Sequence, residues 1–389
     1  MSKLCIISPY YPTKESSIFA FVDELVSKIA DNDVECSVIT PILLGRKNRH
    51  GAQTRRKITS EGRVITIHCP TYLVPHKRVF GVEPIRLFIR SYSNAVVRAY
   101  TKHVHEADAF YGHFLFPSGI TAAYMGKRFN KPSFVACGES NLLNGQQAYM
   151  IYKDLIHTSL SGVVSVSTQM KSQLRRNEIV SDDTPIVVLP NAIDTSKFRI
   201  MNKLDCRKKL GIDDSKFVVC FVGHFIERKG PLRVLRAIER HGDVYGIFVG
   251  GDNLPTQSER IVFCGKVPHD ELSVYLNAAD VFVLPTLAEG CCNAIIEAMA
   301  CGLPIISSNL PFNDDILNDT CSIRIDPNNI DEIAAAIESL KNDVKKRESM
   351  SIAAQMMARK LDINERARTI TGLIEQHIER NQHVIDNKS

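Results

Sequence analysis

Short runs of β-branched and aliphatic residues alternate with amphipathic helical patterns along almost the whole chain. Helical patterns such as Leu232–Arg240, Asp270–Ala279, Asn293–Cys301 and Asn329–Leu340 lie between the runs. This alternation predicts an α/β protein whose parallel sheets carry helices on both faces, in doubly wound, Rossmann-like domains. The predicted strands are Leu4–Ile7, Cys36–Ile39, Val64–Ile67, Ala109–Tyr111, Ser133–Ala136, Val163–Val166 and Ile186–Leu189, then Phe217–Val222, Tyr245–Val249, Ile261–Phe263, Val281–Leu284, Ile305–Ser307 and Ser322–Ile325.

The two series of strands predict two domains, residues 1–195 and 196–389. Between them lies LPNAIDTSKF, residues 189–198, where proline, asparagine and aspartate interrupt the hydrophobic pattern. A chain of 389 residues is also long enough for two cores of ordinary size. Because open parallel sheets bind ligands at the carboxyl ends of their strands, we expect the two sheets to face an interdomain cleft that holds the site. The final helical pattern, Asn364–Arg380, fits either domain, and it could pack back on the first.

Composition and motif spacing argue against a membrane-spanning protein, a secreted protein and a zinc-binding protein. Apolar residues make up 44% of the chain and charged residues 23%, and no run of eighteen apolar residues lacks a charge. The start MSKLCIISPYYP has too short an apolar run for a signal peptide, so we expect a cytoplasmic protein. The eleven cysteines are scattered, without C-x-x-C pairs or zinc spacing, and predict no metal site.

Positive charge is concentrated in one region of the first domain. Residues 42–105 carry a net charge of +11, whereas the whole chain carries +5. Helical spacing places Arg86, Arg90 and Lys102 beside apolar residues, a mixture that suits an anionic membrane surface. No cluster of base-stacking aromatic residues accompanies the cations, so we expect no nucleic-acid partner. A solvated basic surface that maintains solubility is the alternative.

The turn FVGHFIERKGPL follows the first predicted strand of the second domain. It passes Gly223, His224, Arg228 and Lys229 and enters a helix at Gly230-Pro231, where proline suits the first turn. Cations at the carboxyl end of a parallel strand, next to the start of a helix, predict a diphosphate site. A charged surface turn is the alternative. Neither a G-x-G-x-x-G motif nor a P-loop is present.

The stretch EGCCNAIIEAMACGLP, residues 289–304, places two carboxylates eight positions apart. Glu289 lies in the loop after the predicted strand Val281–Leu284, and Glu297 lies inside the helix that begins near Asn293. The free N–H groups at this helix start favour an anion, whereas the carboxylates favour hydroxyl groups. A ligand with both phosphates and sugar hydroxyls would satisfy them all. Alternatively, Glu289 caps the loop and Glu297 is a surface residue.

At these residues the sequence resembles the glycosyltransferases of family four, retaining enzymes of GT-B fold that use nucleotide-diphosphate sugars. The resemblance is carried by KVPHDELSVYLNAADVFVLPTLAEGCCNAIIEAMACGLPIISS, and more weakly by SPYYP, DAFYGHFLFPSGITAA, VSVSTQM, LPNAIDTSKF and VGHFIERKG. It implies that Lys229 binds the donor diphosphate, Glu297 the ribose and Glu289 the transferred sugar, with no metal required. The residues expected to bind the donor are Gly223, His224, Arg228, Lys229, Gly265, Val267, Cys292, Asn293, Ala294 and Glu297.

The sequence departs from the family pattern at three places. His224 stands where the family usually has arginine, so Arg228 becomes the candidate for the missing charge. Cys137, in FVACGESN, stands where many relatives have histidine, which leaves His113 or Glu139 as candidates for that role. The usual pair of glycines after the first proline is replaced by TKESS, residues 13–17. The expected catalytic residues are therefore Glu289, Lys229, His113 and Glu139.

These features predict a retaining glycosyltransferase that extends a glycan or lipid-linked saccharide, in the synthesis of a bacterial surface polysaccharide. We expect it to be cytoplasmic and to bind the inner face of the cell membrane peripherally through residues 42–105. Two alternatives stay open. One is a catalytically silent partner that binds nucleotide-sugar in a polysaccharide assembly complex, and the other is a GT-B sugar-nucleotide epimerase.

Overall fold

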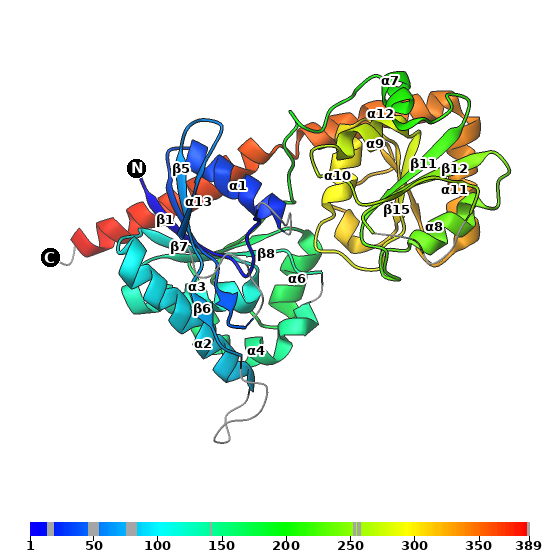
Figure 1. The fold of residues 1–389 in the computed structure, drawn as a ribbon. Helices are drawn as coiled ribbons and strands as arrows, with labels where there is room; N and C mark the ends of the chain where they lie inside the picture. Colours follow the sequence, from blue (N-terminus) through cyan, green and yellow to red (C-terminus); the bar gives the residue numbers. More distant parts are fainter. Residues whose placement is uncertain are drawn as a thin grey trace. The chain divides into compact units, whose positions relative to one another are not determined.

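The computed structural model describes residues 1–13, 19–45, 54–74, 84–140, 142–251, 254 and 258–386 (Figure 1). The chain forms two compact units. Unit 1 comprises Met1–Leu189 and Ile363–Ser389, and unit 2 comprises Pro190–Asp362. The sequence-based boundary near residue 196 lies close to this division. The final helix, α13 (Ile363–Asp386), belongs to unit 1 and packs against α1 (Ala20–Asp31).

Unit 1 is built on an eight-stranded sheet of order β10-β9-β8-β7-β1-β2-β5-β4. Its strands are short and mostly buried, because helices cover both faces. A separate two-stranded sheet joins β3 (Ile42–Leu43) and β6 (Thr71–Tyr72). The strands of the large sheet are β1 (Lys3–Ile7), β2 (Glu35–Ile39), β4 (Thr54–Ile58), β5 (Val64–His68), β7 (Ala109–His113), β8 (Ser133–Cys137), β9 (Gly162–Ser165) and β10 (Ile186–Val188).

The helices of unit 1 form two layers around this sheet. Buried residues of α2 and α3 pack with Cys5 and Phe110 on one face, while Phe134 on the opposite face meets His377 of α13 edge to face, with ring centroids 5.3 Å apart. Figure 1 shows α1 and α13 on the same side of the sheet. The remaining helices of the unit are α2 (Pro84–Ala99), α3 (Ile120–Phe129), α4 (Gln146–Ile151), α5 (Lys153–Ser159) and α6 (Thr168–Arg176), and short turns of helix cover Tyr100–Val104, Leu115–Gly119 and Leu142–Gly145.

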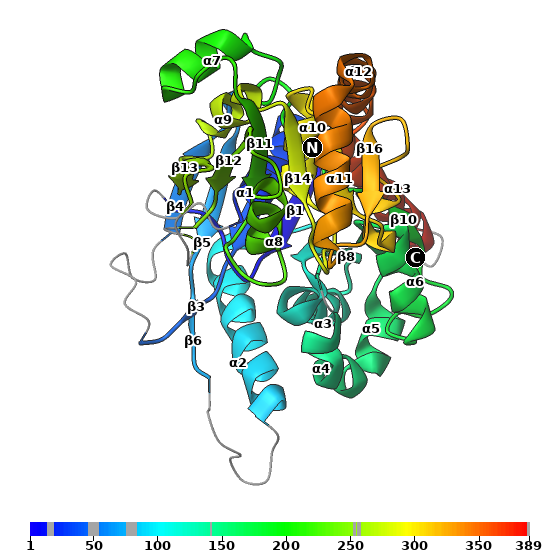
Figure 2. The same ribbon diagram turned by 90° about the vertical axis from the view of Figure 1, so that its right-hand side faces the viewer.

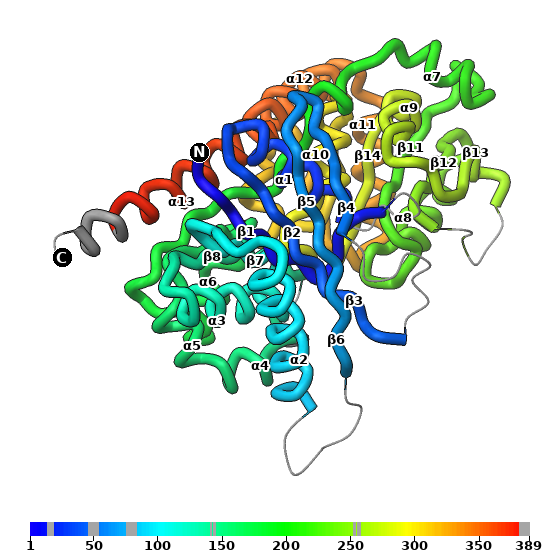
Figure 3. The backbone as a smooth tube through the Cα atoms, turned by 60° about the vertical axis from the view of Figure 1, so that its left-hand side comes forward, coloured from blue at the N-terminus to red at the C-terminus, as the bar shows by residue number. Residues whose placement is uncertain are grey.

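One strand of unit 1 departs from the predicted parallel arrangement. β4 runs antiparallel to β5 at the edge of the sheet, and the two strands lie side by side in Figure 3. Its sequence, TRRKI, is polar and charged, and its residues alternate between exposed and partly buried positions. Charged residues are typical of edge strands, because they discourage pairing with another chain. The hydrophobic pattern carries no signal for such a strand.

Unit 2 contains a six-stranded parallel sheet of order β13-β12-β11-β14-β15-β16. In Figure 2, α8 and α11 lie side by side over one face of this sheet. On the other side α10 packs with α12 and α7 with α9. The strands are β11 (Phe217–Val222), β12 (Val244–Val249), β13 (Ile261–Gly265), β14 (Val281–Leu284), β15 (Ile305–Ser308) and β16 (Ser322–Ile325); the helices are α7 (Lys203–Leu210), α8 (Pro231–Ile238), α9 (Leu272–Ala278), α10 (Asn293–Ala300), α11 (Ile330–Asn342) and α12 (Val344–Arg359), with a turn of 3-10 helix at Pro311–Asn313.

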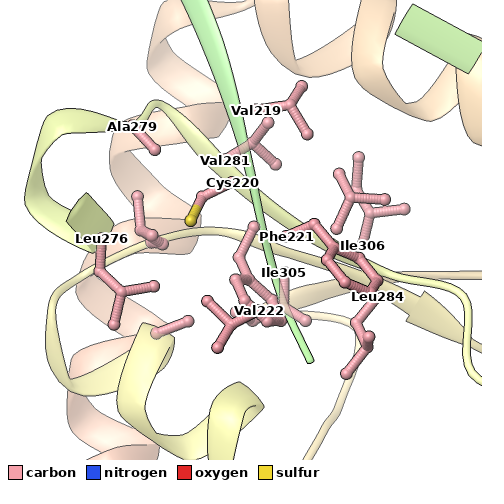
Figure 4. Packing of buried hydrophobic residues seen from close by; sticks show 14 of the residues in the cluster. Val219, Cys220, Phe221, Val222, Leu276, Ala279, Val281, Leu284, Ile305 and Ile306 are labelled. Carbon is pink, nitrogen blue, oxygen red and sulfur yellow. The ribbon is translucent and has the colours of Figure 1, made fainter. Parts of the chain in front are cut away.

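The core of unit 2 brings the carboxyl ends of the central strands close together. Figure 4 shows Phe221 and Val222, at the end of β11, and Leu284, at the end of β14, in one buried hydrophobic cluster. At the next strand end, Gly250 has φ +126°, and a Cβ atom there would lie 2.4 Å from the carbonyl oxygen of Gly223. Only glycine allows this approach of two backbone segments. The turn after β11 therefore lies directly against the end of β12.

The α/β class predicted from the sequence is confirmed, with two large sheets whose strands are parallel except for the edge strand β4. Each of the thirteen predicted strands overlaps a strand of the structure, and each predicted helix overlaps a helix. No helix in the described ranges is long and apolar enough to cross a membrane.

Candidate active site

Two loops of unit 2 bring the predicted donor residues together. The first follows β11 and runs from Gly223 to Gly230, where Pro231 begins α8. The second follows β14 and leads to α10. The N–H of Leu287 donates to the carbonyl oxygen of Arg228 over 2.9 Å, so a backbone hydrogen bond joins the two loops. β11 and β14 are neighbours in the sheet, which is why their carboxyl-end loops meet.

Glu289 lies at the centre of a cluster of charges. Its Oε1 atom is 2.6 Å from Nζ of Lys229 and 2.9 Å from Nη1 of Arg228. The hydroxyl group of Thr286, which is fully buried, donates a third hydrogen bond to the same oxygen over 2.7 Å. Two cations thus surround one carboxylate, and the cluster as a whole carries a net positive charge.

Lys229 is held in its charged form although it is only 9% exposed. Burial opposes the charge, yet the neighbouring Cys292 and Glu289 raise the pKa of Lys229 above the usual value for lysine. Burial raises the pKa of the Cys292 thiol to about 11. This thiol is therefore protonated at neutral pH, and Glu289 is the anion that holds the lysine charge.

The start of α10 lies next to this cluster. Cys292 stands at the N-cap with extended backbone, and its side chain makes no capping hydrogen bond. The first N–H groups of a helix have no partners inside the helix, so those at Cys292, Asn293 and Ala294 suit an anionic ligand. Because Lys229 and this helix start are electrostatic neighbours, phosphate oxygens could be bound by both.

Glu297 lies in the second turn of α10 and is 6% exposed. Its Oε1 atom is 3.0 Å from Nε2 of His269, in the loop between β13 and α9. Glu297 is therefore not the surface residue of the alternative interpretation, and its place in a functional site stays a prediction. His269 is partly exposed, so one side of the pair is accessible.

The remaining predicted donor residues lie at the same edge of the sheet. Gly265 ends β13, and its carbonyl oxygen accepts a hydrogen bond from the N–H of Gly250 over 3.0 Å. Val267, two residues further on, is partly buried against the core. His224 is exposed, whereas Arg228 reaches Glu289. Arg228, and not His224, therefore contributes a positive charge to the cluster around Glu289.

His113 and Glu139 lie in unit 1, at the ends of the neighbouring strands β7 and β8. His113 is 6% exposed and lies among aromatic rings, with centroid distances of 4.9 Å to Phe114 and 5.6 Å to Phe21. Burial, aided by the charge of Arg366, lowers the pKa of His113 to about 3. The imidazole is therefore neutral at neutral pH.

Glu139 holds the turn that follows His113. Its Oε1 atom accepts a hydrogen bond from the N–H of Leu115 over 2.5 Å, while Oε2 is buried and has no partner among the described residues. Burial raises the pKa of Glu139, although backbone N–H groups oppose that shift. Cys137 is fully buried, and burial raises its pKa as well. Cys137 therefore presents a neutral thiol inside the sheet.

The buried state of His113 predicts a pH-dependent stability. In the unfolded chain His113 takes up a proton below about pH 6.5, whereas in the folded chain it does so only near pH 3. Between these values the unfolded state binds more protons, so folding stability falls as the pH falls. At pH 5 the loss should be about 2 kcal/mol relative to neutral pH. Urea denaturation of wild type and His113→Asn, at pH 7 and pH 5, measures it.

The control for this experiment is His105→Asn, because His105 is exposed and has φ +61°, which asparagine tolerates. We expect His105→Asn to keep the pH dependence of wild type and His113→Asn to lose about 2 kcal/mol of it. An unchanged pH dependence in His113→Asn would contradict the burial of a neutral imidazole.

The structure also shows site residues that the sequence did not indicate. These are Thr286, which donates a hydrogen bond to Glu289, and His269, which forms a hydrogen bond with Glu297. Both are single polar residues in loops, and only their place at strand ends could have marked them. Of TKESS, residues 13–17, the four residues Lys14 to Ser17 lie outside the described part of the chain. Within the described ranges, no group of three or more His, Cys, Asp or Glu residues could hold a metal ion.

Known proteins resemble this chain in sequence and in fold. Residues 202–357 match the family described as "Glycosyl transferases group 1". The chain is 26% identical over 289 residues to a teichuronic acid biosynthesis glycosyltransferase, TuaC, of Bacillus subtilis (strain 168), a match that covers 72% of each chain. It is 32% identical over 186 residues to the UDP-Gal:alpha-D-GlcNAc-diphosphoundecaprenol alpha-1,3-galactosyltransferase of Escherichia coli, covering 43% of this chain and 48% of that protein.

The fold is also similar to that of a solved sucrose-phosphate synthase from Thermosynechococcus elongatus. The TM-score is 0.76, at 19% sequence identity, over 97% of this chain and 99% of the other. At that identity the likeness concerns the fold alone. Residues 202–357, which lie in unit 2, thus match the group 1 glycosyltransferases, the family four of the resemblance above, and the chain has the GT-B fold of glycosyltransferases.

Proposed function

We propose that this glycosyltransferase moves a sugar, with retention of anomeric configuration, from a nucleotide-diphosphate sugar to a lipid-linked saccharide. The reaction would belong to the synthesis of a bacterial surface polysaccharide. The names of the two sequence relatives, one of teichuronic acid synthesis and one that acts on a diphosphoundecaprenol-linked sugar, support this choice of acceptor. In the proposal unit 2 binds the donor and unit 1 binds the acceptor.

The observation that carries the proposal is the cluster of Lys229, Arg228 and Glu289 beside the start of α10. A diphosphate would bind the two cations and the N–H groups at Cys292 to Ala294. Glu297, deeper in α10, would accept hydrogen bonds from the ribose hydroxyls. Glu289 would bind hydroxyls of the transferred sugar, with Gly265 and Val267 beside the base. One edge of the sheet thus offers complementary groups to each part of a nucleotide-sugar.

The proposed transfer is completed by the leaving group itself. The bond between the anomeric carbon and the diphosphate oxygen breaks, and its electron pair stays on the diphosphate. The acceptor hydroxyl oxygen bonds to the same face of that carbon, and its proton passes to the diphosphate oxygen. Lys229 and Arg228 stabilise the charge that develops on the diphosphate, so the step calls for no metal. In unit 1, the neutral imidazole of His113 would donate a hydrogen bond to the saccharide acceptor or accept one from it.

An anionic membrane is the surface at which we propose that the enzyme meets its lipid-linked acceptor. Arg86, Arg90 and Arg98 of α2, and Lys102 in the turn after it, are all exposed. Their spacing puts them along one side of the helix, while the apolar residues between them are buried or partly buried. Of the basic region 42–105, residues 46–53 and 75–83 lie outside the described part.

Cosedimentation with vesicles tests this surface. At low salt we expect vesicles rich in anionic phospholipid to bind the protein, and 0.5 M salt to release it, because exposed charges are screened within about 10 Å already at 0.1 M. The double variant Arg86→Gln/Arg90→Gln should bind clearly less than Lys208→Gln/Lys209→Gln, which removes the same charge from exposed positions of α7. Equal binding by both double variants would exclude α2 as the membrane surface.

A transfer assay tests the enzymatic function. The purified protein is incubated with UDP-, GDP- or ADP-sugars and a lipid-diphosphate-linked saccharide, and both released nucleotide and lipid product are measured. We expect slow donor hydrolysis without acceptor, and transfer with it. Nucleotide affinity without turnover would instead indicate a silent binding partner, and interconversion of free nucleotide-sugars would indicate an epimerase.

A further inference from the structure

The segment that enters unit 2, Pro190 to Phe198, contacts the donor site at two places. At its start, Asn191 reaches the loop that leads into α10. Its backbone N–H donates to Sγ of Cys291 over 3.3 Å, and its Nδ2 donates to the carbonyl oxygen of Cys291 over 3.3 Å and to Oδ1 of Asn293 over 2.8 Å. Three hydrogen bonds from one residue thus hold both sides of Cys292, whose N–H begins the proposed phosphate site.

At the other end of the segment, Phe198 supports the proposed ribose site. Phe198 is 3% exposed, and its ring meets that of His269 edge to face, with centroids 5.3 Å apart. His269 in turn bonds Glu297 over 3.0 Å. A rigid, buried aromatic ring behind the imidazole limits the rotamers of His269, and thereby the position of the carboxylate.

The segment is anchored independently of these contacts. The N–H of Ile193, a buried residue, donates to the carbonyl oxygen of Leu361 over 3.0 Å, and Ile193 forms a parallel bridge with Asp362. Thr195 donates from its hydroxyl to Oδ2 of Asp362 over 3.0 Å. These bonds fix the backbone in unit 2 without touching the site. Asn191 and Phe198 therefore project from a fixed support.

We propose that residues 191–198 are a positioning element of the donor site, with Asn191 orienting the phosphate loop and Phe198 orienting His269 and Glu297. The inference rests on the proposed binding of a nucleotide-sugar in unit 2. None of these residues is placed against the reacting atoms, so their effect is on the geometry of groups that bind the donor. The segment is thus part of the site and not only a connection between two domains.

The phosphate end is tested by titrating UDP, by calorimetry, and uridine, by NMR. We expect Asn191→Ala to lower the affinity for UDP roughly three- to tenfold, the effect of losing hydrogen bonds that hold the loop, and to leave that for uridine unchanged. Ser215→Ala, which removes a hydrogen bond in an exposed turn of the same unit outside residues 191–198, should change neither. Unchanged UDP affinity in Asn191→Ala would overturn the inference, and so would equal losses for UDP and uridine.

The ribose end is tested by comparing UDP with 2′,3′-dideoxy-UDP, which lacks the hydroxyls that Glu297 would bind. His269→Asn and Phe198→Leu should each weaken UDP roughly three- to tenfold and leave the dideoxy compound unaffected. A loss of equal size for both compounds would contradict positioning of Glu297. If the wild type bound none of UDP, GDP and ADP, both the proposed function and this inference would be wrong. If the wild type bound a nucleotide and the variants bound it equally well, only this inference would be wrong.

Discussion

Lys229→Met should lower the rate of sugar transfer by about two to three orders of magnitude. Methionine keeps most of the apolar stem of lysine and removes only the charge, which in the wild type lies buried at 9% exposure and 2.6 Å from Glu289. A preorganised cation in a water-poor site stabilises the charge that develops on the leaving diphosphate far more than water does. The rate is measured as nucleoside diphosphate released per enzyme at saturating donor.

Lys208→Met is the matched control, because Lys208 is exposed on α7 in the same unit. It should transfer sugar at the rate of wild type. Circular dichroism and the melting temperature establish that Lys229→Met is folded, which we expect since Glu289 retains Arg228 and Thr286 as partners. Transfer by folded Lys229→Met at the rate of wild type would show that this lysine does not act on the leaving group.

Glu289→Ala should abolish most transfer while strengthening the binding of the nucleoside diphosphate product. In the wild type the carboxylate neutralises part of the charge of Arg228 and Lys229 and would repel phosphate. Its removal frees both cations for the diphosphate, but removes the group that would bind the sugar. We therefore expect a loss in rate of about a hundredfold or more and a several-fold gain in UDP affinity.

The two readouts of Glu289→Ala separate catalysis from folding. A misfolded variant would lose UDP affinity as well as rate, whereas the proposed role changes them in opposite directions. The transfer rate and the UDP affinity of Glu289→Gln should lie between those of Glu289→Ala and wild type, because an amide oxygen can still accept hydrogen bonds from Thr286 and the sugar. Full turnover in Glu289→Ala would rule out the assigned role.

Much of the fold follows from the hydrophobic pattern, for a physical reason. Strands buried on both faces must be apolar throughout, as in FVVCFV of β11, so they stand out from amphipathic helices. β4 escaped prediction because an edge strand needs no apolar run, and TRRKI reads as a charged loop. The need for glycine at position 250 could not be predicted either, because it arises from Gly223, which becomes a neighbour only in the folded chain.

The sequence predicts which residues of the site lie at strand ends and what chemistry their side chains offer, but it does not predict how these side chains contact one another. Glu289, Lys229 and Arg228 belong to loops that follow neighbouring strands, so their meeting was foreseeable. That all three polar partners of Glu289 bind the same oxygen is set by side-chain geometry, which no spacing encodes. The sequence places Asn191 only in a connection between domains, because nothing in LPNAIDTSKF shows that its amide reaches Cys291 and Asn293.

A thermal-shift screen against nucleoside diphosphates and their sugars tests the central claim, a donor site in unit 2, most directly. A ligand that binds only the folded protein raises the melting temperature by mass action, by an amount equivalent to about 2.7 kcal/mol at a hundredfold excess over Kd. We predict a clear shift with one nucleotide family, lost in Lys229→Met and in Glu297→Ala. No shift with UDP, GDP or ADP, or a shift that both variants retain, would contradict the assignment of this site.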